Sequence, residues 1–232
     1  MNSLPLACNE IEALRRMDAC SVANAIETFN TRLPNEGFAD RSIRCLLPKL
    51  PSMVGYAVTL KIRGANPPTG RRSYLDRTDW WDYVKTVPEP RILVVQDESS
   101  KPGIAALLGE VHISILMALG CVGAVTNGSV RDFPAIEKLG FHVFAGGLSV
   151  SHAYVHIVEV GLPVTVGGLV VQSSDLIHGD LHGIQTIPVG IASRLPDAAA
   201  HLATLDQAII ALCRSSDFTL SKLRTAVSSR QS

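Results

Sequence analysis

The pattern of apolar and polar residues is most regular in the middle of the chain. Ile92-Leu93-Val94-Val95 is a continuous apolar run, typical of a strand buried on both faces of a sheet. Gly120 ends a helical pattern, and further apolar runs follow it. The predicted elements alternate: strand 92–95, helix 103–119, strand 121–126, helix 131–140 and strand 141–145. This order, with short connections such as a turn at Asn127-Gly128, predicts a parallel three-strand core with right-handed crossovers.

Outside this core the apolar positions often recur every second residue. Residues 163–172 predict two short strands joined by Gly167-Gly168, a dipeptide that favours a two-residue hairpin turn. Residues 177–188 predict another strand, tight turn and strand. Residues 55–62 alternate like a half-buried strand, whereas the prolines, glycines and arginines of residues 64–72 predict a long loop.

Helical spacing marks both ends of the chain. Residues 10–29 predict two short helices, the second capped by Asp18 or Ser21. Residues from 196 to the end, rich in alanine and leucine, predict one or two more helices. Another short helix begins at aromatic residues that we expect to pack on the core or on a neighbouring subunit, in preference to stacking on a ligand: Trp80, Trp81 and Tyr83.

Length and composition limit the domain organisation and the partners. Of the 232 residues, 47% are apolar, which is ample for a buried core. We expect one domain over residues 1–232, with a core at about 18–190 and a C-terminal helical extension at about 196–232. Lysine plus arginine and aspartate plus glutamate each total 21, so the net charge is zero. No long-range field then favours nucleic acid or a membrane surface, and partners must be sought in local sites.

Cysteine usage and the N-terminus predict a cytoplasmic location. The five cysteines are scattered without a CxxC pair, and several lie in apolar runs where a thiol packs as a small hydrophobe. Acidic residues appear before any apolar stretch of signal length, and no run approaches the roughly 18 to 20 apolar residues of a membrane span. We therefore expect reduced thiols, no export and no membrane insertion.

Polar residues gather where the predicted parallel strands end. Ligands of open parallel sheets bind outside the carboxyl ends of the strands, next to helix N-termini. Three segments fit that geometry: Gln96-Asp97, Gly109-Glu110 and residues 127–132. We expect their side chains to converge at one edge of the sheet.

Arg131 and Asp132 can present a fixed cation and a fixed anion to one small ligand. An arginine fork matches a carboxylate, and an aspartate suits a hard divalent cation such as magnesium, which keeps several waters. Asp132 is also a good helix N-cap, and Arg131 could be a solvated surface residue. The spacing alone leaves both interpretations open.

The chain resembles the family that contains 4-hydroxy-4-methyl-2-oxoglutarate aldolases and the regulator of ribonuclease activity A. Glu110 is followed by twenty residues and then Arg131-Asp132, and the aldolase members carry such an acidic residue, twenty positions and Arg-Asp. The resemblance covers roughly residues 18–188. It also includes these segments: Gly55-Tyr56-Ala57-Val58-Thr59, residues 139–145, residues 163–168 and Gly179-Asp180 with Gly183.

The resemblance implies a role for each matching residue. Asp132 matches the aspartate that binds a divalent metal, Mg²⁺ or Mn²⁺, and Arg131 matches the arginine that contacts the pyruvyl part of the substrate. Glu110 matches the acidic residue that orients a metal-bound water. The backbone amides of Val111 and His112 would receive the substrate carboxylate, as amides near a helix start can.

The implied activity is that of a class II aldolase: a metal-dependent lyase that cleaves a 4-hydroxy-2-oxo acid to pyruvate and a second carbonyl compound. Oxaloacetate decarboxylation is an expected second activity, because it leaves the same enolate. The resemblance also implies a layered β/β/α domain, a parallel core extended by antiparallel hairpins, with helical termini. Its members' assembly implies a homotrimer or homohexamer with the site between subunits.

Two positions depart from the family pattern, and three histidines are further candidates. Asn127-Gly128 stands where the family often has Asp-Gly, and Gly146 stands where it often has arginine; either change could alter the charge of the pocket. The set His178, Asp180 and His182 has the alternation of a metal site, but a structural turn is favoured. His152 lies on a predicted loop from which it could reach the site.

Two other functions compete with the aldolase. One is a non-catalytic protein that docks on a ribonuclease, as the family's namesake does; Glu110 argues against it, because members without the acidic residue are those without aldolase chemistry. The other is a lyase or decarboxylase that uses the same metal and arginine on a different substrate.

Overall fold

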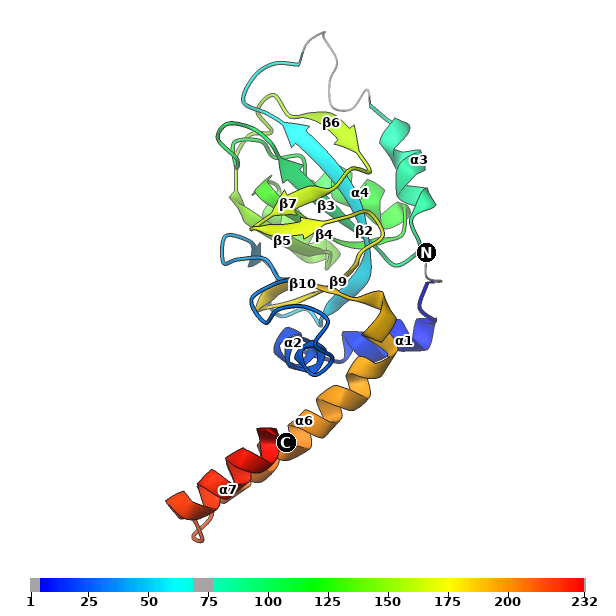
Figure 1. Ribbon diagram of the computed structural model, residues 1–232. Helices are drawn as coiled ribbons and strands as arrows, with labels where there is room; N and C mark the ends of the chain where they lie inside the picture. The colour runs from blue at the N-terminus through cyan, green and yellow to red at the C-terminus, as the bar shows by residue number, and fades with distance from the viewer. Residues whose placement is uncertain (1–4, 69–76, 232) are drawn as a thin grey trace.

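The computed structural model describes residues 5–68 and 77–231, and its main sheet is built on four parallel strands (Figure 1). The strands β3 (Arg91–Asp97), β4 (Cys121–Val130) and β5 (His142–Leu148) are the three that the apolar runs predict. The alternating segment before them, β2 (Met53–Arg63), also joins in parallel, beside β3. The prediction of three parallel strands was therefore one strand short.

Antiparallel strands extend this parallel core. The order across the sheet is β1-β5-β4-β3-β2-β9-β10, and β6 pairs with the far end of β2. β2 is long enough to hold β9 at its start and β6 at its end. The antiparallel strands of this sheet are short: β1 (Arg44–Cys45), β6 (His156–Val160), β9 (Leu176–Asp180) and β10 (Gly183–Ile187).

Three helices connect the parallel strands: α3 (Asp79–Thr86), α4 (Glu110–Ala118) and α5 (Phe133–Leu139). The prediction of a helix over residues 103–119 is wrong for its first half, because residues 103–109 are not helical. The carbonyl of Ala105 accepts a hydrogen bond from the amide of Ser129 in β4. The predicted turn at Asn127-Gly128 is also wrong, since β4 continues through both residues as a bulge.

Both faces of the sheet are covered, which confirms the layered β/β/α fold. On β3, Leu93 and Val95 face the core under the helices, whereas Ile92 and Val94 face a second core under a separate hairpin. That hairpin consists of β7 (Val164–Val166) and β8 (Leu169–Val171) and lies across the sheet in Figure 1. A strand buried on both faces needs apolar residues at consecutive positions, as the sequence of β3 shows.

The two predicted tight turns are confirmed. Gly167 and Gly168 both have positive φ, 53° and 74°, as a hairpin turn of type I′ requires. Between β9 and β10, the Asp180 carboxylate accepts hydrogen bonds from the His182 amide and, at 2.8 Å, from the Ala19 amide. Asp180 therefore joins the turn to the start of the second helix, which supports the structural interpretation of His178, Asp180 and His182.

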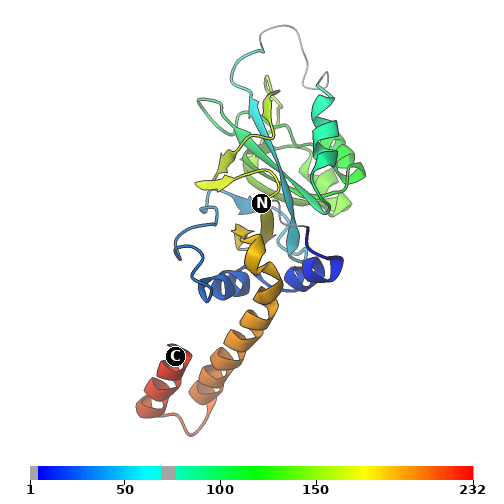
Figure 2. The ribbon, with the colours of Figure 1, turned by 45° about the vertical axis from the view of Figure 1, so that its right-hand side comes forward.

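Helices form both ends of the chain, as predicted. After α1 (Cys8–Arg15), Asp18 caps α2 (Ala19–Glu27) by accepting from the Ser21 amide. At the other end, the 3-10 helix η2 (Val189–Arg194) leads into α6 (Leu195–Arg214) and α7 (Leu220–Gln231), which extend away from the sheet in two views (Figures 1 and 2).

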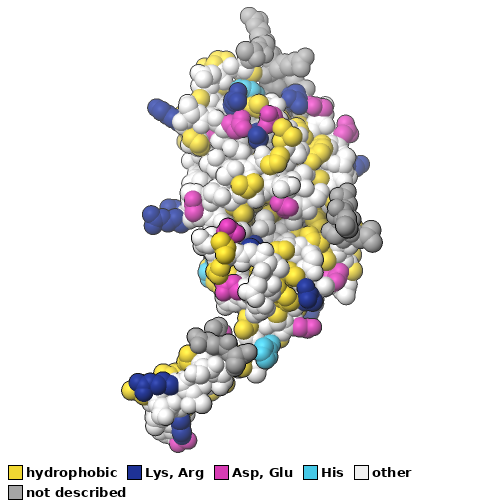
Figure 3. Space-filling model, viewed as in Figure 1, with side chains coloured by type: hydrophobic (Ala, Val, Ile, Leu, Met, Phe, Trp, Pro, Cys, Tyr) yellow, Lys and Arg dark blue, Asp and Glu magenta, His cyan; other side chains and the backbone are white. Residues whose placement is uncertain are grey.

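Two other features of the described residues concern the surface. Acidic and basic side chains are interspersed on the face drawn in Figure 3, in keeping with the zero net charge. Within residues 5–68 and 77–231, no helix combines the length and apolar character that a membrane crossing requires. The predicted loop is irregular over residues 64–68, and its remainder lies outside the described residues.

Buried histidines should make stability depend on pH. Burial lowers the pKa of His112, His142 and His178. The unfolded chain, with histidine pKa near 6.5, then takes up protons first as the pH falls. The free energy of unfolding therefore keeps its full value above about pH 6.5. Below that pH it falls, by up to about 1.4 kcal/mol per pH unit for each such histidine. Urea unfolding at pH 7.5 and 5.5 measures the loss.

A pair of variants tests whether buried histidines cause this pH dependence. His178→Asn should lose less stability between the two pH values, because it removes one buried group that titrates. His201→Gln changes an exposed residue of α6 and should keep the full pH dependence. The same pH dependence in wild type and His178→Asn would contradict the explanation.

Candidate functional site

The end of β4 presents Arg131 and Asp132 next to each other. Asp132 has φ 58° and ψ 31°, the left-handed conformation, which aspartate tolerates better than most residues. Asp132 occupies the N-cap position of α5, but its side chain makes no capping hydrogen bond. Its Oδ1 lies 3.4 Å from Arg131 Nε. The interpretation of Asp132 as an ordinary helix cap is therefore wrong.

Glu110 reaches the same place by a different route. The last part of the segment of residues 98–109 runs parallel to the end of β4, where Leu108 forms a parallel bridge with Val130 and accepts a hydrogen bond from the Arg131 amide. α4 then begins at Glu110, whose amide donates to Asp132 Oδ2 at 3.4 Å. The structure thus brings the backbone of Glu110 next to the adjacent pair Arg131 and Asp132, which follows it by more than twenty residues in the sequence.

Gly109 makes this close approach possible. A Cβ atom at position 109 would lie 2.6 Å from Asp132 Oδ2 and 3.2 Å from Arg131 Cγ. The first of these distances is shorter than real Cβ contacts allow. Sequence reasoning placed Gly109 at the edge of the sheet without seeing this steric role, because the contact joins residues more than twenty positions apart.

The start of α4 also presents the two predicted anion-binding amides. Val111 and His112 are the second and third residues of α4, where amides have no carbonyl partner within the helix. The Val111 side chain is 64% exposed, whereas His112 is buried. Both amides thus belong to the helical turn that begins beside Asp132, with the positive end of the helix dipole at the site.

Gln96 and Asp97, predicted near the site, serve the framework instead. The Asp97 carboxylate is buried and accepts hydrogen bonds from the Ser99 and Gly103 amides at 2.9 and 3.0 Å. Gln96 Oε1 accepts from the amide of Thr165 in β7. These two side chains hold the surrounding backbone at the edge of the sheet where the polar residues were predicted to converge.

The two departures from the family pattern meet in one bulge. Asn127 and Gly128 of β4 lie opposite the single residue Gly146 of β5. A Cβ atom at position 146 would lie 2.9 Å from the Asn127 carbonyl oxygen. The absence of a side chain at position 146 therefore accommodates the bulge.

His152 follows β5 at the same edge of the sheet. It is exposed, and its Nδ1 lies 2.7 Å from the carbonyl oxygen of Ala153. Ser149, in the same segment, donates its amide to the Val130 carbonyl at the end of β4. The segment is thus anchored next to Arg131, and a role for His152 there stays a prediction.

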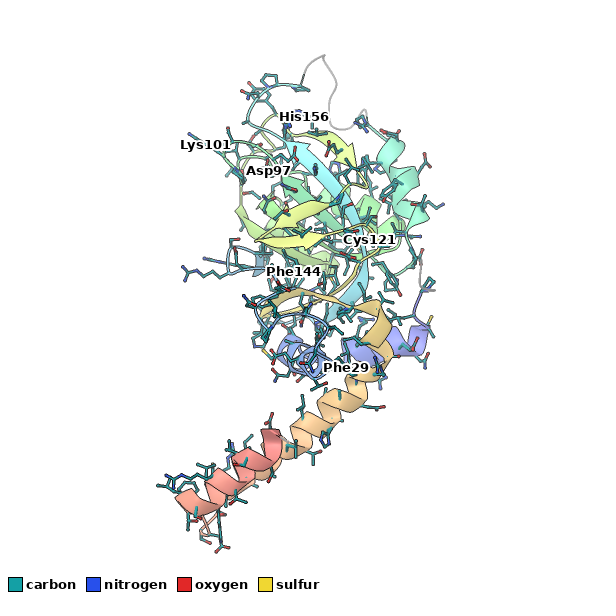
Figure 4. The ribbon with its side chains drawn as sticks, viewed as in Figure 1. Phe29, Asp97, Lys101, Cys121, Phe144 and His156 are labelled. Carbon is teal, nitrogen blue, oxygen red and sulfur yellow. The ribbon has the colours of Figure 1, made fainter. Side chains whose placement is uncertain are left out.

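The site is an open edge of the molecule. The side chains of Arg131 and Asp132 are 34% and 40% exposed. A cavity of about 320 Å³ lies elsewhere, lined by residues that include Cys121 and His142 at the starts of β4 and β5. Figure 4 shows Cys121 well separated from Asp97, which ends β3. Parallel sheets bind ligands at the carboxyl ends of their strands, and we place the candidate site there.

Fold and site together define the class: an α/β protein with an acidic residue and an Arg-Asp pair at the carboxyl edge of a parallel sheet. The chain belongs to the RraA-like family, described as Aldolase/RraA, whose model matches residues 19–185. This match confirms the family predicted from the motifs.

Individual relatives agree with the family. The chain is 31% identical over 86 residues to a protein of Halalkalibacterium halodurans provisionally named 4-hydroxy-4-methyl-2-oxoglutarate aldolase. That match covers 37% of this chain and 41% of the relative, so the chain spans about two fifths of that relative's length.

Two crystal structures share the fold. An uncharacterized protein from Pseudomonas syringae has a TM-score of 0.72 and 20% identity, with 97% of each chain covered. RraAS2 from Streptomyces coelicolor, described as an unusual member of the RNase ES inhibitor RraA protein family, has a TM-score of 0.68 and 20% identity. The alignment covers 88% of this chain and 97% of the RraAS2 chain. At this identity the likeness establishes the fold alone.

The steric role of Gly109 predicts a specific loss. Gly109→Ala should push the Asp132 carboxylate away from the Glu110 amide. If Asp132 binds a divalent metal, as the family resemblance implies, the affinity for Mn²⁺ should fall roughly tenfold for a loss of about 1.4 kcal/mol of binding free energy. Titration with Mn²⁺, followed by its paramagnetic resonance signal, measures the affinity. Gly190→Ala is the control, since a Cβ at position 190 meets nothing within 4 Å. Equal Mn²⁺ affinity in the two variants would contradict the prediction.

Proposed function

We propose that the chain is a divalent-metal-dependent lyase that cleaves a 4-hydroxy-2-oxo acid to pyruvate and a second carbonyl compound. The observation that carries this proposal is that the Glu110 backbone amide and the Arg131 guanidinium both lie 3.4 Å from the Asp132 carboxylate at the start of α4. A carboxylate, a guanidinium and helix N-terminal amides there face one small open edge. The named relative from Halalkalibacterium halodurans supports an aldol reaction in particular.

The donor set fits a hard cation held by few protein ligands. Both contacts of the Asp132 carboxylate are long, at 3.4 Å, and the side chain is 40% exposed, so its oxygens can take a further partner. Among the described residues, no group of three His, Cys, Asp or Glu could enclose a metal ion. Zinc sites use three or four such ligands, whereas Mg²⁺ or Mn²⁺ is held by one or two carboxylates and waters. Asp132 would hold the ion, which when bound supplies a positive charge that polarises the 2-oxo group.

The chain's own groups would bind the pyruvyl end of the substrate. The Arg131 guanidinium can donate two parallel hydrogen bonds, to the carboxylate and to the 2-oxo oxygen. The Val111 and His112 amides would receive the other carboxylate oxygen at the positive end of the α4 dipole. These contacts orient C3 and C4 of the substrate toward Glu110.

Glu110 would handle the proton. When the C3–C4 bond breaks, its electron pair moves into the pyruvyl unit and the C4 hydroxyl becomes a carbonyl, which requires loss of the hydroxyl proton. A Glu110 carboxylate oxygen can accept that proton through one water and later return it to C3. Arg131 stabilises the negative charge that develops on the 2-oxo oxygen in between.

The same arrangement would decarboxylate oxaloacetate. There the departing group is carbon dioxide, so the electron pair again moves into the pyruvyl unit. No hydroxyl proton has to leave first, and Glu110 would serve only the final protonation of C3. This activity is therefore expected to accompany the aldol cleavage and to depend less on Glu110.

We also infer that the working form is a homotrimer or homohexamer. Apolar side chains are exposed on the segments that form the site, with Val111 at 64%, Leu148 at 58% and Val150 at 98%. Contiguous exposed apolar side chains are typical of surfaces that another protein chain covers. A neighbouring subunit that buries them would also shield the open edge from water. A ribonuclease that covers the same edge is the rival explanation.

The metal assignment gives the first activity test. Excess chelator should abolish pyruvate release, and added Mg²⁺ or Mn²⁺ should restore it. Asp132→Asn should abolish release at every metal concentration, because asparagine keeps the left-handed conformation but loses the anionic ligand. Asp197→Asn, on exposed α6, is the control. Full activity in excess chelator would eliminate the metal-dependent mechanism.

The proton transfer gives the second test. Glu110→Gln should lower aldol cleavage by roughly 10²- to 10⁴-fold, the range expected for loss of a positioned acid–base group. Oxaloacetate decarboxylation should fall less, and Mn²⁺ and pyruvate binding should persist. Glu137→Gln, an exposed position on α5, should change neither activity.

The outcomes separate the possible roles. Equal loss of both activities in Glu110→Gln would indicate that Glu110 serves metal binding or folding. If the unmodified protein releases no pyruvate from any of a panel of 4-hydroxy-2-oxo acids or from oxaloacetate, the proposal fails and the ribonuclease-docking function is favoured.

A further inference from the structure

The sheet has a gap in its hydrogen bonding just before the site. β3 pairs with β4 up to Val95 and Thr126, and then the bulge at Asn127 and Gly128 changes the path of β4. β4 nevertheless runs on to Val130. Beyond the bulge the partner on this edge of β4 is no longer β3 but the segment of residues 98–109, while β5 stays paired on the other edge.

The Asn127 side chain closes this gap. Its Oδ1 accepts from the Asp97 amide at 2.6 Å, and its Nδ2 donates to the Asp97 carbonyl at 3.1 Å. Because an amide N–H can only donate and a carbonyl can only accept, the orientation of the Asn127 carboxamide is fixed. The side chain thus replaces one rung of the β3–β4 ladder.

Asp97 links Asn127 to the segment that leads to Glu110. While its backbone is held by Asn127, its carboxylate accepts from the Ser99 and Gly103 amides. Ser129 holds the segment from β4, since its Oγ donates to the Gly103 carbonyl at 2.6 Å. The segment is therefore held from both strands before it reaches Glu110.

We propose that Asn127 is a positioning residue, which sets the place of Glu110 and of the first turn of α4 relative to Arg131 and Asp132. The family often has aspartate at this position, but in this chain an aspartate would lose the bond to the Asp97 carbonyl, because a carboxylate has no N–H to donate and would set an anionic oxygen against that carbonyl. The inference rests on the proposed function for its kinetic consequence. The claim that Asn127 holds the segment of residues 98–109 in place does not depend on the proposed function.

The groups that Asn127 positions differ from those that β4 holds by itself. Arg131 and Asp132 follow Val130, which remains paired with Leu148 of β5. A looser segment would therefore displace Glu110 and the α4 amides and leave the metal ligand in place. This separation distinguishes a positioning role from general destabilisation.

Three variants test the proposal in the full-length chain. Asn127→Asp should speed amide hydrogen exchange of residues 98–109 by roughly tenfold or more, since local opening becomes easier. It should lower kcat/KM for pyruvate release by roughly 10- to 100-fold, the cost of a misplacement near 1 Å. Its Mn²⁺ affinity should stay within about twofold of wild type, which corresponds to about 0.4 kcal/mol.

Ser129→Ala is a milder second variant, in case Asn127→Asp does not fold. It loses only the bond to Gly103 and should show the same changes at smaller size. Asn24→Asp makes the same chemical change on the exposed face of α2 and should match wild type.

Unchanged hydrogen exchange over residues 98–109 in both variants would show that the hydrogen bonds between Asn127 and Asp97, here called the brace, do not hold this segment. Faster exchange with unchanged kcat/KM would overturn the positioning role. If wild type has no lyase activity, the proposed function fails together with the kinetic role, and hydrogen exchange alone still decides whether Asn127 holds the segment.

Discussion

The second half of β4 needs a hydrogen-bonding partner beyond the point where β3 ends, and the segment before α4 supplies it. The amides of Ser129 and Arg131 donate to the carbonyls of Ala105 and Leu108. Buried backbone groups must be paired, so this segment is held in a fixed register without being a regular strand. Glu110 follows Leu108 by two residues and Asp132 follows Val130 by two. The register therefore decides which side chains meet at the site.

Two conformational constraints, at Asp132 and Gly109, also determine the geometry of the site. Asp132 adopts the left-handed conformation, which orients its carboxylate toward Gly109 and Glu110 and away from a capping role on α5. Such a conformation costs about 1 to 2 kcal/mol, and its presence at a site is a reason to look for function there. Gly109 leaves the space that the carboxylate occupies. The site thus depends on one residue without a side chain and on one with an uncommon backbone conformation.

The two covered faces of the sheet explain why this edge can be open. Apolar side chains of β3 fill a core under the helices and another under the β7–β8 hairpin, so the strands are fixed along their length. Polar chemistry can then be confined to the loops and helix starts beyond the strand ends. The bulge and the segment beside it still contribute to the core under the helices, because Leu107, Leu108 and Val130 are buried in it.

The sequence by itself determined the elements with strong periodicity, the glycine turn at Gly167-Gly168 and the segments that flank the site. These depend on local patterns, in which each residue's type reports its own environment. It also indicated the family, since Glu110 and Arg131-Asp132 stand at a fixed spacing. Only the tertiary structure decided that residues 103–109 pair with β4 and do not form a helix, because long-range backbone pairing overrode local helical propensity. The contact of Gly109 with Asp132 and the brace from Asn127 to Asp97 join residues more than twenty positions apart. No local pattern encodes such contacts, which exist only once the strands lie side by side.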